Sequence, residues 1–237
     1  MLDHERLYPV RWAHRRVRDQ FGYEVLRGPF RGLRYPEAVA LDIEAYSGKL
    51  LGTYECELHD TIEALIDESP ATVVNIGASD GYYAIGLARR LPHATVHAFD
   101  TNVAHHDTLR AIAAENAIED RIVIRGECDF ATLEELGAGA LIVCDCEGCE
   151  LPLLDPARVP GLRSARMLIE CHDIIDERVT TTLSTRFSET HDLEIIPARP
   201  RWVSDYPELS FMPLVTQQLA IDEFREGPMH WLVGRPR

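Results

Sequence analysis

The chain has 237 residues, of which 46% are hydrophobic and 27% are charged. This composition excludes a disordered or collagen-like chain, and the length suffices for one large domain, or one domain with an extension, around a core of its own. Asp and Glu total 39 against 24 Lys and Arg, so the formal net charge is −15. A surface this acidic repels phosphate groups, and we therefore expect neither a nucleic-acid partner nor docking on anionic lipid.

The sequence contains no apolar run near the roughly 18 residues that a membrane span requires. The first six residues are mostly charged and do not begin a secretory signal. We therefore expect a cytoplasmic protein without membrane association, in which the six cysteines are reduced thiols. Lys49 is the single lysine of the chain, which we interpret as a compositional habit and not as a sign of function.

The N-terminal segment is basic. Residues 1–34 hold eight arginines against four acids, a local charge of 8 − 4 = +4. Apolar spacing over residues 9–26 predicts a helix that packs one face on the main domain or on a partner subunit, the second case giving a homodimer through this arm. No aromatic-stacking pattern supports a nucleic-acid arm. A turn-rich connector follows at 28–36, and we divide the chain into a helical arm with its connector at 1–50 and a main domain at 51–237.

Helix-like and strand-like stretches alternate from about residue 53. In chain order, the patterns predict a helix at 55–68, a strand at 72–76, a helix at 81–91, a strand at 95–99, a helix at 103–116, a strand at 121–125, a short helix at 130–136, strands at 140–144 and 166–170, a helix at 176–187, and strands at 193–196 and 230–233. This alternation predicts βαβ units and a mostly parallel sheet covered on both faces. Ligands of such sheets bind beyond the carboxyl ends of the strands, so we expect the functional residues there.

A glycine turn follows the first predicted strand. Gly77 and Gly81 allow a tight turn and a close approach of backbone to ligand, and the next helix points its N-terminus at that ligand. Asp100 ends the second predicted strand, where a carboxylate can accept hydrogen bonds from both hydroxyls of a ribose. The alternative for Asp100 is a cap for the helix that begins near residue 103. Together, the turn and the acid predict a nucleoside-binding site.

The spacing of this turn separates two classes of nucleotide. A dinucleotide-binding turn has the pattern G-x-G-x-x-G, whereas this turn is G-x-x-x-G, with Ser79 where a second glycine would admit a pyrophosphate. The sequence therefore favours a ligand without a diphosphate, such as S-adenosylmethionine, over the nicotinamide cofactor of an oxidoreductase.

Four ordered motifs carry a resemblance to a known family. They are G-T-Y-E at residues 52–55, N-I-G-A-S-D-G-Y-Y at 75–83, D-C-E-G-C-E at 145–150 and E-C-H-D at 170–173. They resemble motifs of the class I S-adenosylmethionine-dependent methyltransferases, most closely the FkbM-like branch. The resemblance implies a Rossmann-like, doubly wound α/β fold with a mostly parallel seven-stranded sheet, to which this chain adds an N-terminal helical extension. It implies methyl transfer from S-adenosylmethionine to a hydroxyl oxygen of a small molecule or a glycan.

The resemblance also implies a set of donor-binding residues. The glycine turn lines the methionine and ribose side, Asp100 holds the ribose, and Glu127 or Asp129 lies near the adenine. The full implied set is Tyr54, Glu55, Asn75, Gly77, Ala78, Ser79, Asp80, Gly81, Tyr82, Asp100, Glu127 and Asp145. The chain departs from the family pattern at Asn75, which replaces an acid, and in the third motif, where cysteines replace small apolar residues.

Titratable side chains gather after two predicted strands that should be neighbours: Asp145, Glu147, Glu150, Glu170, His172 and Asp173. So many acids at one edge should raise some carboxyl pKa values and attract a cation. In a first route, His172 is the general base, with Glu170 and Glu147 as further catalytic candidates. In a second, Asp145, His172 and Asp173 hold a divalent cation, magnesium or a similar ion rather than zinc, which lowers the pKa of the acceptor hydroxyl. The plain alternative is that His172 and Glu170 only make structural hydrogen bonds.

The cysteines suggest an alternative function. Cys146 and Cys149 form a C-x-x-C pair with Cys144 nearby, and a zinc site needs four converging ligands. The flanking acids raise thiol pKa values and disfavour a redox role, so we predict buried or half-buried small residues. The alternative reading of the chain is a metal-dependent binding or regulatory module on the same fold, with Cys146, Cys149 and His172 as ligands and no methyl transfer.

Overall fold

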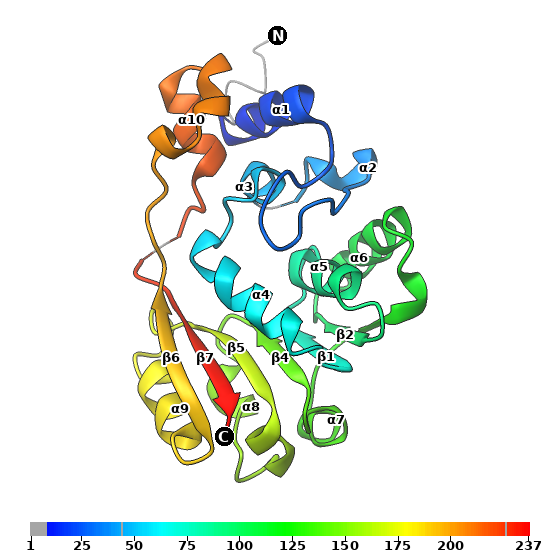
Figure 1. Ribbon diagram of the computed structural model, residues 1–237, viewed down its shortest axis with the longest axis vertical. Coiled ribbons are helices and arrows are strands. Elements are labelled where there is room, and N and C mark those ends of the chain that lie inside the picture. The colour runs from blue at the N-terminus through cyan, green and yellow to red at the C-terminus, as the bar shows by residue number, and fades with distance from the viewer. Residues whose placement is uncertain (1–8, 44, 226) are drawn as a thin grey trace.

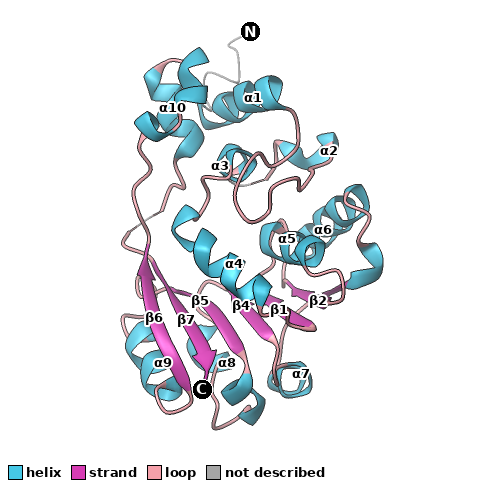
Figure 2. Ribbon diagram, in the orientation of Figure 1, coloured by secondary structure: helices cyan, strands magenta, loops and turns pink. Residues whose placement is uncertain are grey.

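The computed structural model describes residues 9–43, 45–225 and 227–237. Its strands form one seven-stranded sheet in the order β3-β2-β1-β4-β5-β7-β6 (Figure 2). The strands are β1 (Thr72–Ile76), β2 (Thr95–Phe99), β3 (Ile122–Arg125), β4 (Leu141–Cys144), β5 (Arg166–Cys171), β6 (His191–Pro197) and β7 (His230–Pro236). β7 pairs antiparallel with both of its neighbours, and every other pairing is parallel. The mostly parallel sheet with one antiparallel strand is therefore confirmed.

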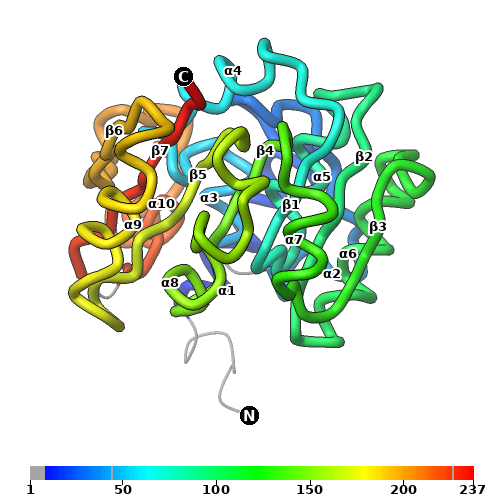
Figure 3. Tube along the Cα trace, turned by 90° about the horizontal axis from the view of Figure 1, so that it is seen from below, coloured from blue at the N-terminus to red at the C-terminus, as the bar shows by residue number. Residues whose placement is uncertain are grey.

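Helices cover both faces of the sheet, so the fold is Rossmann-like and doubly wound. Figure 3 shows the sheet between α4 and α8. The helices are α1 (Pro9–Phe21), α2 (Glu37–Ala40), α3 (Tyr46–Leu51), α4 (His59–Asp67), α5 (Tyr82–Arg90), α6 (Val103–Glu115), α7 (Phe130–Leu136), α8 (Glu150–Leu153), α9 (Val179–Phe187) and α10 (Leu214–Ile221). No helix of the described residues is both long and apolar enough to cross a membrane.

The inner strands β1 and β4 are largely apolar because both faces of the sheet are buried there, whereas the edge strand β6 has exposed polar residues. Along β1, Val73 joins the core on the α4, α5 and α6 side, whereas Val74 joins the core on the α7, α8 and α9 side. This alternation follows from the two-residue period of a strand. Parallel strands covered on both faces become near-continuous apolar runs, which is why the sequence pattern located β1 to β5 within one residue. The last two strands are longer than expected: β6 begins two residues earlier, and β7 ends three residues later.

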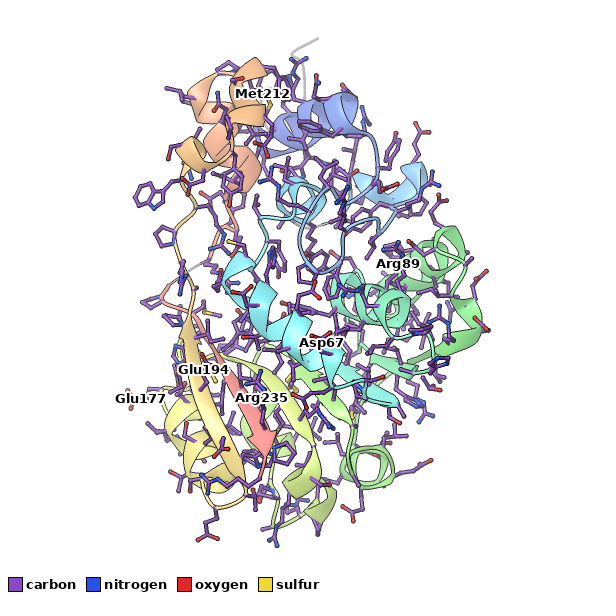
Figure 4. All side chains as sticks on the ribbon, in the orientation of Figure 1. Asp67, Arg89, Glu177, Glu194, Met212 and Arg235 are labelled. Carbon is purple, nitrogen blue, oxygen red and sulfur yellow. A yellow bond between two sulfur atoms is a disulfide. The ribbon has the colours of Figure 1, made fainter. Side chains whose placement is uncertain are left out.

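The N-terminal segment packs on the sheet domain and on α10. Ala13 and Val17 of α1 are fully buried, and α1 lies beside α10 at one end of the molecule (Figure 1). Buried Met212 lies at the same end (Figure 4). The predicted helix at 9–26 ends at Phe21, because Gly22 adopts a φ of +83°. The sequence analysis missed α3, whose six residues are all buried and therefore show no amphipathic period.

We predict that His14 makes the protein less stable in mild acid. His14 lies on α1 and is 5% exposed; its burial, helped by the charges of Arg11 and Lys49, lowers its pKa from 6.5 to about 4. Between pH 6.5 and pH 4, the unfolded chain therefore binds a proton on this histidine that the folded chain does not bind. The free energy of unfolding keeps its full value above pH 6.5 and falls as the pH falls towards 4. A difference of about 2.5 units corresponds to roughly 3 kcal/mol.

Urea unfolding at pH 7.5 and pH 4.5 checks this prediction. His14→Phe should lose less stability between the two pH values than the wild-type protein does. His93→Gln, at an exposed position, is the control and should behave like the wild-type protein. An equal acid-induced loss in His14→Phe and in the wild-type protein would show that His14 is not responsible.

Candidate active site

A cavity of about 900 Å³ opens at the carboxyl ends of β1, β2, β4 and β5. Its walls are the glycine turn after β1, the loops after β2, β3, β4 and β5, Ala45 and Lys49 from the N-terminal segment, and residues 223–225 and Met229 before β7. Figure 1 shows why these segments meet: α3 lies above the sheet, on the side to which the parallel strands point. The volume lies within the range of small-molecule sites, and its position is the one expected for a ligand of a doubly wound sheet.

The glycine turn forms the floor of this cavity. Gly77 and Gly81 have φ values of +78° and +87°, and Gly81 is the N-cap of α5. The backbone N–H groups of Gly77 and Ala78 both donate to the carbonyl of Phe99 at 2.9 Å. A Cβ on Gly77 would lie 1.6 Å from the carbonyl oxygen of Asp145. The turn is therefore pressed against the backbone of the loop after β4, which only glycine permits.

Asp100 lines the cavity next to this turn. One of its carboxylate oxygens accepts from the N–H of Ser79 at 2.7 Å, and the other accepts from the N–H of Asn102 at 2.8 Å. Nδ1 of His105 lies 3.0 Å from the same carboxylate. The N-cap of α6 is Asn102, whose side chain accepts from Ala104. The cap alternative for Asp100 is thus wrong, and its carboxylate joins the glycine turn to the cavity wall.

His172 is held by a buried carboxylate on one side and faces the cavity on the other. Its Nδ1 donates to Oε1 of fully buried Glu150 at 2.6 Å. Its Nε2 is buried and has no hydrogen-bond partner among the described residues. Oxygens of Glu147 and Asp145 lie 3.3 and 3.5 Å from Nε2. Because the carboxylate of Glu150 fixes the proton on Nδ1, Nε2 keeps a lone pair available to accept a proton.

Burial and negative charge act against each other at this histidine. Burial lowers the pKa of His172, but its hydrogen bond to Glu150 and the charges of Glu150, Glu170 and Glu147 outweigh burial and raise the pKa above its ordinary value. The pKa of Asp145 is raised well above its usual range by burial and by the charge of Glu170. The sequence predicted such raised carboxyl pKa values at this edge.

The predicted cation-binding set differs from the observed cluster in one residue, because Glu147 is found where Asp173 was expected. Ligand atoms of Asp145, Glu147 and His172 lie within 4.8 Å of one another. Asp173 lies elsewhere: its carboxylate accepts from the backbone N–H and the hydroxyl of Thr180 and faces Nε2 of His230 at 3.0 Å. Its assignment as a metal ligand with Asp145 and His172 is therefore wrong, because adjacent residues at a strand end point to opposite sides and Asp173 points towards α9.

Arg225 joins several acids at the cavity wall. Its guanidinium bonds Glu55 and Glu223 at 2.8 Å each, and also Glu170. Glu55 is 1% exposed, and burial followed by the charge of Glu170 raises its pKa to about 8. Glu55 also accepts from the hydroxyl of Tyr83. Of the predicted donor-binding residues, Glu55 therefore supports the wall without lining the cavity.

The other predicted donor-binding residues divide in the same way. Asn75 is buried in β1, where its Nδ2 donates to the carbonyl of Val143 at 3.3 Å, and Gly81 shapes the turn from behind. The remaining predicted residues line the cavity: Tyr54, Gly77, Ala78, Ser79, Asp80, Tyr82, Asp100, Glu127 and Asp145. Glu147, Glu170 and His172 line it as well.

The expectation of six reduced cysteines is wrong. Cys146 and Cys149 form a disulfide, with Cα atoms 5.5 Å apart. The turn between them contains Glu147 and Gly148 at φ values of +54° and +110°, and it folds back far enough to bring the sulfurs together. The expectation of reduced thiols came from the compartment expected for the whole protein, and such an argument cannot predict the local geometry of one turn. Because the two sulfurs are bonded to each other, neither is a thiolate ligand for zinc in this structure.

We predict that the protein, unfolded in denaturant without reductant, exposes four thiols. The four unpaired cysteines are Cys56, Cys128, Cys144 and Cys171. Titration with a thiol reagent should count these four, and reduction before titration should raise the count to six. Six thiols without reductant, in protein purified under air, would contradict the disulfide.

Comparisons with known proteins add a likeness of fold. No protein-family model matches the sequence, and no curated protein matches it. Among solved structures, a putative O-methyltransferase from Klebsiella pneumoniae is 14% identical, with 96% of this chain and 90% of that chain covered and a TM-score of 0.49. The O-methyltransferase TomG from Streptomyces achromogenes, in complex with SAM, is 9% identical with the same coverage and TM-score. An O-methyltransferase from Bacillus cereus, in complex with SAH, is 14% identical over 78% of this chain and 91% of that chain, with a TM-score of 0.47. At TM-scores below 0.5, none of these likenesses decides what reaction this chain performs.

Three residues of the site escaped the sequence analysis. Lys49 and Arg225 line the cavity from segments outside the recognised motifs, and Glu150 was included only as one acid among several. The sequence feature that could have pointed to Lys49 is that it is the single lysine of the chain. No sequence pattern distinguishes Arg225 from the other arginines, since two of its three partners, Glu55 and Glu170, come from distant segments.

Proposed function

We propose that this protein is an S-adenosylmethionine-dependent methyltransferase that methylates a hydroxyl oxygen of a small molecule or a glycan. One observation carries the proposal. A single cavity contains both the glycine turn with Asp100, which suit an adenosyl group, and a buried histidine whose Nε2 has no hydrogen-bond partner in the part of the chain that the structure describes. The resemblance of the sequence motifs to the FkbM-like branch supports the proposal independently.

The residues of the cavity fit the donor. The Asp100 carboxylate has lone pairs left for the ribose hydroxyls beyond the two backbone bonds that it accepts. Glu127 and Asp129 line the wall beyond β3, on the side where the adenine belongs in this proposal. The backbone of residues 77–80 approaches the cavity without bulky side chains at Gly77 and Ala78. Ser79 stands where a dinucleotide-binding turn has its second glycine, which disfavours the nicotinamide alternative.

The chain's own groups would prepare the acceptor. When bound, the donor would supply a methyl group on a sulfonium: the bond from the acceptor oxygen to the methyl carbon would form as the carbon–sulfur bond breaks, and S-adenosylhomocysteine would leave. The cavity aligns the two reactants and excludes water. Nε2 of His172 accepts the proton of the acceptor hydroxyl, and the Glu150 carboxylate at Nδ1 stabilises the resulting imidazolium. Glu147 and Glu170 add negative charge around this cation.

A divalent cation is a second route to the same reaction. The observation in its favour is the convergence of Asp145, Glu147 and His172. A cation bound there would lower the pKa of the acceptor hydroxyl, so that the hydroxyl loses its proton without a strong base. Carboxylate oxygens suit magnesium or manganese, and an imidazole nitrogen adds affinity for transition metals. Metal analysis of protein purified without added metal, followed by assays with chelator and added magnesium, distinguishes the two routes.

Transfer of a tritiated methyl group tests the proposal. The protein is incubated with labelled S-adenosylmethionine and a panel of hydroxyl-bearing small molecules and glycans, and the labelled products are separated. We expect at least one acceptor to become labelled by the wild-type protein and, at a donor concentration near the wild-type dissociation constant, to be labelled several-fold more slowly by Asp100→Ala. Tight, stoichiometric zinc without any methyl transfer would instead favour the metal-binding module.

A further inference from the structure

We propose that Lys49 binds the carboxylate at the amino-acid end of the methyl donor, an inference that rests on the proposed function. Lys49 belongs to α3, in the N-terminal segment that no recognised motif includes. Its side chain is 7% exposed, and it lines the cavity beside the glycine turn. A buried cation at a ligand cavity is costly unless something compensates its charge.

The position of Lys49 matches the end of the donor that the other residues leave unassigned. Its ammonium bonds the Asp80 carboxylate, which also accepts from the N–H of Tyr82 at 3.1 Å. The rings of Tyr54 and Tyr82 lie 4.9 and 6.0 Å from Nζ. The backbone N–H of Ser79 donates to Asp100, the residue assigned to the ribose. Asp80 is the next residue along the turn, so the ammonium of Lys49 that it holds lies just beyond the ribose side of the site. With Asp100 holding the ribose, the amino-acid end of the donor extends towards this cation.

The charge of the cavity makes such a cation necessary. Eight acids line its wall: Asp80, Asp100, Glu127, Asp129, Asp145, Glu147, Glu170 and Glu223. A ligand carboxylate entering these surroundings is repelled unless a positive group receives it. Among the described lining residues, the two Lys or Arg side chains are Lys49 and Arg225. Arg225 is already bonded to three carboxylates, whereas Lys49 has three N–H donors and one carboxylate partner, Asp80.

The residue type supports a positional role. The chain uses arginine for its other basic residues, 24 − 1 = 23 of them, and lysine here alone. An ammonium is a compact charge on a thin stem, and here it lies close to the rings of both Tyr54 and Tyr82, where a planar guanidinium needs more room. The single lysine is therefore explained by its place in the cavity, in contrast to the compositional interpretation given above.

Two ligands that differ in the amino-acid end test this inference. S-adenosylhomocysteine carries the carboxylate, whereas 5′-methylthioadenosine has the same nucleoside and sulfur without it. We expect Lys49→Gln to weaken S-adenosylhomocysteine by about 10- to 100-fold, as for the loss of a charged hydrogen bond. Binding of 5′-methylthioadenosine should change by less than about threefold. Calorimetric titration of both ligands gives the ratio of the two affinities, which a purely structural lysine would leave unchanged.

Removing Lys49 alone leaves Asp80 as an unpaired buried carboxylate, which can destabilise the protein. The double variant Lys49→Gln with Asp80→Asn removes both charges and should show the same loss of discrimination between the ligands. Arg90→Gln, which breaks the half-exposed pair with Glu63 outside the cavity, is the control and should retain the wild-type ratio. An unchanged ratio in both Lys49 variants would overturn this inference alone.

A second readout uses the wild-type protein. Because Lys49 is the single lysine, lysine labelled with carbon-13 at Cε gives one protein signal in an NMR spectrum. We expect S-adenosylhomocysteine to shift this signal and 5′-methylthioadenosine to leave it in place. The inference would be contradicted if both ligands shifted the signal equally, or if both ligands bound and neither shifted it. Wild-type protein that binds neither ligand would instead overturn the proposed function, and this inference with it.

Discussion

Gly77→Ala should lower the free energy of unfolding by about 2–5 kcal/mol and abolish donor binding. The new Cβ would lie 1.6 Å from the carbonyl oxygen of Asp145 and 2.6 Å from its carbonyl carbon, so the backbone of one loop must move. A left-handed φ of +78° adds about 1–2 kcal/mol for a residue with a side chain, and overpacking adds about 1–3 kcal/mol. For a chain of this size, the melting temperature should fall by roughly 10 °C.

Gly126→Ala is the matched control, because Gly126 also lines the cavity. A Cβ on Gly126 meets nothing within 4 Å, and its φ is not in the left-handed region. Its stability should stay within about 0.5 kcal/mol of the wild-type value. Thermal unfolding of the wild-type, Gly77→Ala and Gly126→Ala proteins, followed by calorimetry, tests this prediction. A Gly77→Ala protein as stable as Gly126→Ala would mean that the turn does not press on the loop after β4.

His172→Gln should reduce methyl transfer by about 10²–10⁴-fold, the usual contribution of a general base. The donor contacts assigned to the glycine turn and Asp100 do not include His172, so the dissociation constant for S-adenosylhomocysteine should change by less than about threefold. Glutamine keeps a polar side chain that can still hydrogen-bond Glu150, which limits the disturbance of the buried pair. Turnover is measured with the acceptor found in the labelling screen, and affinity by calorimetry.

His93→Gln, at an exposed position, is the control for His172 and should leave both quantities unchanged. Equal losses of turnover and affinity in His172→Gln would assign His172 a structural role at the sheet edge. Unchanged turnover would exclude it as the base and would leave the cation route for the activation of the acceptor.

The sheet and its ligand-binding edge were predictable because they depend on local patterns. Each strand of a sheet buried on both faces is a short apolar run, and the glycine turn and Asp100 follow directly after two of these runs. Strand order then brings His172 close to Asp145, since β4 and β5 are neighbours. Side-chain direction at a strand end was harder to predict, which is why Asp173 was placed on the wrong side.

The parts of the site that were missed depend on contacts between distant segments. Arg225 meets Glu55 across 170 positions of sequence, and Lys49 meets Asp80 across 31. The C-x-x-C pair was recognised, but its oxidation follows from a turn with two left-handed residues. No periodicity encodes such a turn.

Calorimetric titration of the wild-type protein with S-adenosylhomocysteine, and separately with NADH, decides whether the glycine turn and Asp100 form an adenosyl site. We expect one molecule of S-adenosylhomocysteine to bind per chain, Asp100→Ala to weaken it by at least about tenfold as a charged hydrogen-bond partner is lost, and NADH to give no heat. Binding of NADH, or no binding of S-adenosylhomocysteine or S-adenosylmethionine by folded protein, would contradict the assignment.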